Sequence, residues 1–167
     1  MPLKPCFLSQ ILIDDQENQF VVFVTERDGL RRIPIVIGPM EAVAIDRAVK
    51  GQRFSRPLTH DLVVTLLESA KLSCKEVRIT DLKEGTFFAK LVLDASGSEI
   101  AIDARPSDCL ALAVRVKCPI YIDESVVGAY HVTSRTVRRA FLTGYDPRTG
   151  VDCSHRKEML ERRLETL

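Results

Sequence analysis

The chain has 167 residues, of which 46% are hydrophobic and 28% are charged, and its formal net charge is +1. This composition is typical of a soluble globular domain, and a charge near zero gives no global attraction to nucleic acid or to a membrane surface. The sequence has neither a signal-peptide pattern nor an apolar run near the roughly 18 residues of a membrane span. Its five cysteines, an odd number without Cys-x-x-Cys spacing, argue against a disulfide framework and a zinc knuckle. We therefore expect a cytoplasmic protein with no membrane partner.

The first part of the chain predicts three strands and then two helices. Proline is favoured at the first position of a helix, so Gly38-Pro39 predicts a helix over about 40–50 with Glu41 in its first turn. Thr59 is a good N-cap and predicts a second helix, which ends near Leu72 and carries its apolar side chains on one face. The strands are rich in β-branched and aromatic residues and form a predicted antiparallel meander at residues 6–13, 19–26 and 32–37.

The second part predicts further strands, one apolar helix and a helical tail. The strands are expected at residues 75–81, 86–94, 99–104 and 120–122. From Ser134 the pattern changes to short helices, with eight Lys/Arg against five Asp/Glu over 134–167. We therefore expect an α+β fold of antiparallel or mixed sheets with buried helices over residues 1–133, followed by a helical C-terminal extension over 134–167.

The helix that follows the strand at 99–104 has an unusual composition. From Cys109 to Val116 its only polar side chain is Arg115, and a helix that is apolar on all sides is covered on more than one side. Three charged residues, Asp103, Arg105 and Asp108, stand at its start. Because desolvating charge is costly, these groups are expected to pair with each other, to cap the helix or to bind a ligand.

Two helix starts share one pattern. The first opening reads Arg56-Pro57-x-Thr59-His60-Asp61 and the second reads Arg105-Pro106-Ser107-Asp108. One interpretation is helix capping used twice, with a hydroxyl residue and a first-turn carboxylate in each opening. The other is an anion site, because helix N-termini attract phosphate and arginine pairs with it. That interpretation assigns anion binding to Arg56, Thr59, Arg105 and Ser107, and it requires the two openings to converge with Glu41.

Carboxylates and a histidine in the same segments are suited to phosphodiester hydrolysis. The candidate catalytic residues are His60, Asp61, Asp103 and Asp108, and Glu41 with Asp108 is the candidate metal pair. Such oxygen ligands suit Mg²⁺ or Mn²⁺, which would activate a water as nucleophile while the arginines stabilise the developing charge. No P-loop, Gly-x-Ser-x-Gly or His-Glu-x-x-His motif is present.

Several segments in this order resemble the bifunctional nuclease domain family, also called domain of unknown function 151. They cover residues 33–38, 41–45, 56–62, 87–91, 102–108 and 119–121 within a span of about 5–130. The resemblance implies an α+β fold, self-association into a homo-oligomer and, for the plant members, nuclease activity on RNA and DNA. It supplies no agreed catalytic set, so the residues named above rest on their chemistry. We therefore expect a nuclease with RNA or DNA as partner, and the alternative is a non-catalytic anion-binding or regulatory oligomeric module.

Overall fold

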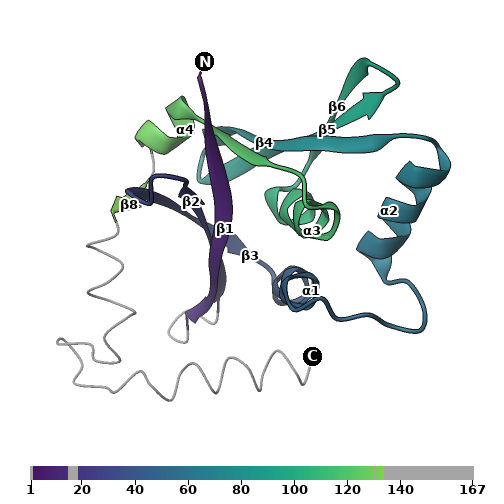
Figure 1. Cartoon of the computed structure of the whole chain (residues 1–167). Helices are drawn as coiled ribbons and strands as arrows, with labels where there is room; N and C mark the ends of the chain where they lie inside the picture. The colour runs from purple at the N-terminus through teal and green to yellow at the C-terminus, as the bar shows by residue number, and fades with distance from the viewer. Residues whose placement is uncertain (1, 15–18, 130, 134–167) are drawn as a thin grey trace.

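The computed structural model describes residues 2–14, 19–129 and 131–133, which form one mixed α+β unit (Figure 1). The predicted helical extension over 134–167 lies outside the described residues. Within them, no helix is long and apolar enough to cross a bilayer.

The described strands form one eight-stranded sheet of order β6-β5-β4-β7-β1-β2-β3-β8. Its first half is the predicted antiparallel meander, β1 (Leu3–Asp14), β2 (Gln19–Glu26) and β3 (Arg31–Ile37), with the short β8 (Val132–Thr133) at its edge. Its second half is another antiparallel meander, β4 (Ser73–Lys83), β5 (Thr86–Ala95) and β6 (Ser98–Ala104). The strand β7 (Ile120–Asp123) joins the halves, since it pairs antiparallel with β1 and parallel with β4.

Four described helices complete the unit: α1 (Pro39–Val49), α2 (Thr59–Ser69), α3 (Pro106–Val116) and α4 (Glu124–Ala129). The helix α3 contacts α1, α2 and the strands β4 and β5, and Figure 1 shows it between α1 and the β4–β5 ribbon. Every residue from Cys109 to Ala113 is buried, as its apolar composition predicts. The α+β prediction is confirmed, and α3 is the helix around which the core packs.

The prediction of a buried helix is wrong for α2. No residue of α2 is buried, and Leu62 and Leu66 are 49% and 58% exposed, because α2 packs mainly against α3 and β4 along one side. Residues Ile100 and Ile102 of the alternating strand β6 are 42% and 44% exposed, since β6 is an edge strand at the end of the sheet. A periodic apolar pattern predicts a helix or strand, but not what covers its apolar face.

The N-cap predicted at Thr59 is displaced by one residue. Leu58 occupies the N-cap position of α2, and its backbone N–H donates to Asp61 Oδ2 at 3.0 Å. The carboxylate at the third helical position therefore satisfies a free N–H at the helix start, which is the carboxylate half of a capping box. Thr59 is the first helical residue and is exposed.

Candidate functional site

Three helix starts meet at one place. The chain enters α1 directly from β3, α2 from the basic link over 50–58, and α3 directly from β6. Prolines at the starts of α1 and α3 set the helical φ where no N–H partner is needed. The first turns of the three helices supply Glu41, His60 and Asp108, and the N-cap residue of α3 is Arg105. We call these four residues the Arg105 cluster.

Arg105 connects two of the helices. Its Nε and Nη2 donate to the two carboxylate oxygens of Asp108 at 2.8 and 3.1 Å, and its Nη1 donates to Glu41 Oε1 at 2.8 Å. The paired, fork-like contact to Asp108 is the geometry that arginine makes best with a carboxylate. The guanidinium side chain is still 66% exposed, so it is held in place but open to a ligand from solvent.

His60 joins the second opening to the first. Its Nε2 lies 3.3 Å from Asp108 Oδ1, and its side chain is only 16% exposed. Partial burial raises the pKa of Asp108, but hydrogen bonds from Arg105 and His60 outweigh it and the net pKa is lowered. Asp108 is therefore an ionised acceptor at neutral pH, which requires His60 to carry its proton on Nε2.

Asp61 belongs to a different contact. Its Oδ1 accepts from Arg115 Nε at 2.7 Å, and this hydrogen bond is the main reason that the pKa of Asp61 is lowered. Arg115 is 11% exposed and also donates to the backbone carbonyls of Ala44 and Ala111 at 3.1 and 2.9 Å. Arg115 thus ties the start of α2 to α1 and α3, and this places the neighbouring His60. The sequence carried a signal for it, since Arg115 is the one polar side chain in an otherwise apolar helix segment.

Besides Asp61 and Ser107, three predicted site residues lie outside the Arg105 cluster. Arg56 is exposed in the link before α2, Thr59 is exposed at the helix start, and Asp103 is exposed on the edge strand β6 opposite Lys90. Among the described residues, none of the three makes a hydrogen bond or an ion pair to the cluster. The structure therefore brings together Glu41, His60, Arg105 and Asp108, all predicted, and leaves these three apart.

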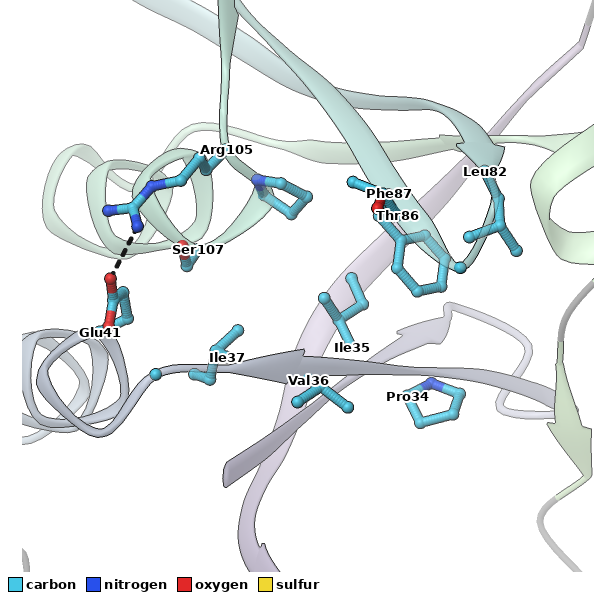
Figure 2. A pocket seen from close by; sticks show the side chains of 13 residues that line it. Pro34, Ile35, Val36, Ile37, Glu41, Leu82, Thr86, Phe87, Arg105 and Ser107 are labelled. Carbon is cyan, nitrogen blue, oxygen red and sulfur yellow. Dashed lines mark hydrogen bonds and ion pairs between the residues drawn. The ribbon is translucent and has the colours of Figure 1, made fainter. Parts of the chain in front are cut away.

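A pocket of about 600 Å³ adjoins the cluster. Figure 2 shows α3 and Arg105 on one side of it, β3 on another and the turn between β4 and β5 on a third. Most of its lining side chains are apolar; three polar residues, Glu41, Arg105 and Ser107, lie at the α3 end, and Thr86 lies at the β4–β5 side. The Ser107 residue is only 7% exposed, and among the described residues its hydroxyl has no hydrogen-bond partner. Among the described residues, the buried side-chain polar atom without a partner is Arg32 Nε, so the Ser107 hydroxyl is reached by solvent from this pocket.

Gly38 makes room for the Glu41 carboxylate. A Cβ built on Gly38 would lie 2.3 Å from Glu41 Oε2, far closer than two such atoms approach. The backbone of Gly38, with φ −74°, would accept any residue, so the lack of a side chain is needed for space and not for conformation. Glycine at this N-cap position lets Glu41 fold back toward Arg105.

The sequence pattern of the bifunctional nuclease domain matches residues 21–135. The chain belongs to the bifunctional nuclease domain family. An uncharacterised protein of Mycobacterium tuberculosis is 46% identical over 117 residues, which cover 70% of each chain. A protein named Bifunctional nuclease 2 from Oryza sativa subsp. japonica is 31% identical over 132 residues, 77% of this chain and 40% of its own length.

A more distant plant relative is named Bifunctional nuclease 1, from Oryza sativa subsp. indica. It is 25% identical over 118 residues, 69% of this chain and 36% of its own length. The matched segment therefore spans less than half of these plant relatives. The family resemblance predicted from the sequence is confirmed by these matches.

In this structure both carboxylates of the predicted metal pair are bonded to Arg105. The guanidinium of Arg105 already occupies the space between Glu41 and Asp108, where a cation would have to sit. Among the described residues, no group of three or more His, Cys, Asp or Glu side chains is arranged to hold a metal. A divalent cation at the predicted Glu41–Asp108 pair would need Arg105 to leave both carboxylates, which costs the hydrogen bonds that hold it.

Proposed function

We propose that the protein is a nuclease that hydrolyses phosphodiester bonds in RNA, DNA or both. The observation that carries this proposal is the contact of His60 with Asp108. Asp108 also forms an ion pair with Arg105, which lines the neighbouring pocket. Membership of the bifunctional nuclease domain family and the names of the plant relatives support the same reaction class.

His60 is the proposed general base. Because Asp108 accepts from Nε2, the lone pair of the neutral imidazole is on Nδ1, and Nδ1 makes no hydrogen bond to a described residue. A base held by a carboxylate on its far nitrogen is oriented and remains able to take a proton. Asp108 would also stabilise the imidazolium that forms when His60 is protonated.

Arg105 is the proposed phosphate ligand. A guanidinium has five N–H groups, and the contacts to Asp108 and Glu41 use three of them. The exposed remainder can donate to a non-bridging phosphate oxygen and stabilise the charge that grows there in the transition state.

These groups account for hydrolysis without a further reagent. The oxygen of a water molecule attacks phosphorus as its proton passes to Nδ1 of His60. The bond from phosphorus to the leaving sugar oxygen breaks, and that oxygen takes the proton back from the imidazolium. The products are a phosphate monoester and a free sugar hydroxyl, and His60 returns to its starting state.

The charge balance favours this activity over the alternative of a simple anion-binding module. With His60 neutral, the two carboxylates and one guanidinium of the cluster leave it with a net negative charge. Such a site has little attraction for a phosphate that makes no other contact with the protein. It is better matched to a diester that is held by contacts elsewhere along a larger substrate.

The test is cleavage of end-labelled single-stranded RNA and DNA by the full chain in Mg²⁺, in Mn²⁺ and in EDTA. We expect His60→Ala and Asp108→Asn to lose about 100-fold or more of kcat, the scale of general base catalysis. Activity in EDTA would show that general base catalysis by His60 suffices for cleavage. Activity that requires Mg²⁺ or Mn²⁺ would support the metal-assisted mechanism expected from the sequence.

Matched controls come from the same chain. Asp46→Asn removes a carboxylate that is 18% exposed and that, among the described residues, forms its ion pair with Lys50 on α1; His131→Ala removes an exposed histidine near α4. Both should keep full activity and normal far-ultraviolet circular dichroism. Cleavage that persists unchanged in folded His60→Ala and Asp108→Asn proteins contradicts the proposal.

A further inference from the structure

The pocket beside the Arg105 cluster has walls that a phosphate does not need. The strand β3 contributes Ile35 and Ile37, the β4–β5 region contributes Leu82 and Phe87, and Pro106 closes the α3 side. Figure 2 shows the side chains of Ile35 and Ile37 directed from β3 toward α3 and Phe87. A volume of about 600 Å³ with mostly apolar walls and a few polar groups is typical of a site for a small organic ligand.

Ser107 gives this pocket a specific polar contact. Its residue is more than nine-tenths buried, it lines the pocket, and its hydroxyl has no partner among the described residues. Because solvent reaches this hydroxyl from the pocket, a ligand that enters the pocket can replace the water there and take up the hydrogen bond. A hydroxyl can both donate and accept, which suits the mixed edge of a nucleobase.

The pocket and the cluster are continuous, because Glu41 and Arg105 belong to both. A phosphate on Arg105 therefore places the sugar and base next to it at the pocket mouth. We infer that the pocket receives one nucleobase, unstacked from its neighbours, whose adjoining phosphate lies on Arg105. This inference rests on the proposed nuclease function, and it adds that the substrate is single-stranded.

A duplex meets this requirement only at a cost. A paired base must leave its partner and both stacking neighbours before it enters the pocket, whereas a single strand offers bases that are already unpaired. Contacts of apolar or aromatic side chains with a base are also tolerant of sequence. We therefore expect a strong preference for single-stranded over double-stranded substrate and a weak preference among the four bases.

The first experiment measures binding without cleavage. Uridine 5′-monophosphate, ribose 5-phosphate and inorganic phosphate contain no internucleotide diester, so their affinities for the wild-type chain can be compared directly by calorimetry. We expect the nucleotide to bind about tenfold or more tightly than ribose 5-phosphate. Equal affinities would overturn the inference.

The second experiment uses cleavage. A single-stranded oligonucleotide with one abasic position is compared with its natural parent and with the matching duplex. We expect kcat/KM to fall about tenfold or more at the bonds beside the abasic position and throughout the duplex. Cleavage of all three substrates at one rate would overturn the inference while leaving the nuclease proposal intact.

Ser107→Ala tests the polar contact, with Ser107→Thr as its matched control because threonine keeps the hydroxyl. We expect Ser107→Ala to weaken uridine monophosphate about fivefold, the scale of one hydrogen bond, and to leave ribose 5-phosphate unchanged. Nucleotide binding without any cleavage would refute the nuclease proposal and keep the pocket assignment. Equal losses for both ligands in Ser107→Ala would show that the hydroxyl does not contact the base.

Discussion

The contact between Arg115 and Asp61 gives the most direct test of how the site is held. Arg115 lies in the last turn of α3, and its guanidinium reaches Asp61 on α2 and the Ala44 carbonyl of α1. The variant Arg115→Met keeps most of the apolar stem and removes the charged end. If Arg115 places α2, this change should lower both stability and activity.

The cost can be worked out from what each partner loses. The backbone carbonyls of Ala44 and Ala111 lie inside helices, where each accepts a hydrogen bond from the backbone N–H of the fourth residue after it. Neither carbonyl is therefore left without a partner when Arg115 is replaced. Asp61 loses its guanidinium, but its side chain is 38% exposed and water can solvate it. The expected loss is therefore about 1–2 kcal/mol, below the roughly 3–5 kcal/mol of a fully buried pair broken on one side.

The chain has no tryptophan, so urea unfolding is best followed by circular dichroism at 222 nm. A loss of this size lowers Tm by roughly 2–4 °C for each kcal/mol in a chain of this length. Asp61→Asn should cost less, because an amide oxygen can still accept from Arg115 and from the Leu58 N–H. The double variant should show about 0.5–1.5 kcal/mol of coupling.

Activity decides whether the contact positions His60 or only stabilises the fold. We expect Arg115→Met to lower kcat at a temperature where the variant is fully folded, with KM little changed, because α2 carries the base. Lys90→Met is the control, since Lys90 is exposed on β5 and makes no ion pair with a described residue. A stability loss under about 0.3 kcal/mol, or unchanged kcat in a destabilised Arg115→Met protein, would refute the reasoning.

Three further predictions concern charge. Gly38→Ala should push the Glu41 carboxylate off Arg105, and Glu41→Gln should remove its charge. Both changes leave Arg105 more free to bind phosphate, so both should lower KM for an oligonucleotide in steady-state cleavage. A raised KM in both variants would contradict this. Arg105→Lys should reduce kcat/KM about tenfold with a Tm change under about 2 °C, because lysine cannot make the paired contact and the side chain is exposed. The hydrogen bond from Arg31 lowers the pKa of Glu124 from 4.5 to about 2. In this pH range the unfolded chain therefore binds more protons than the folded chain, and the free energy of unfolding should fall as the pH drops from about 4.5 to 2. Urea unfolding at several pH values measures this, and a Glu124→Gln protein whose stability falls equally steeply with pH would disprove the prediction.

Much of the site follows from short-range sequence patterns. A proline after a strand, followed by a first-turn carboxylate, predicts a helix start from local chemistry alone, and the starts of α1 and α3 are found there. The burial of α3 likewise follows from its composition. The sequence does not show whether the residues of the Arg105 cluster converge, because that depends on how α1, α2 and α3 pack.

The rest depends on distant contacts that no local pattern encodes. Arg115 and Asp61 are 54 positions apart, and although the apolar helix marks Arg115 as unusual, nothing in the sequence identifies Asp61 as its partner. The exposure of α2 depends on which elements reach it, and a stripe such as Leu62 and Leu66 reads the same whether it is covered or not. The place of β7 between β1 and β4 is also a long-range choice, since its two neighbours lie far away in the chain.

The helix α3 combines two tasks that are usually separated. Its N-terminal end carries Arg105 and Ser107 at the pocket and Asp108 against His60, and its C-terminal end carries Arg115, which holds the helix that supplies His60. Because its middle is fully buried, the two ends cannot shift independently, and the distance from base to phosphate ligand is fixed by one rigid element. Small changes in the buried middle of α3, such as Ala111→Gly, should therefore reduce activity by more than their effect on the folded fraction accounts for.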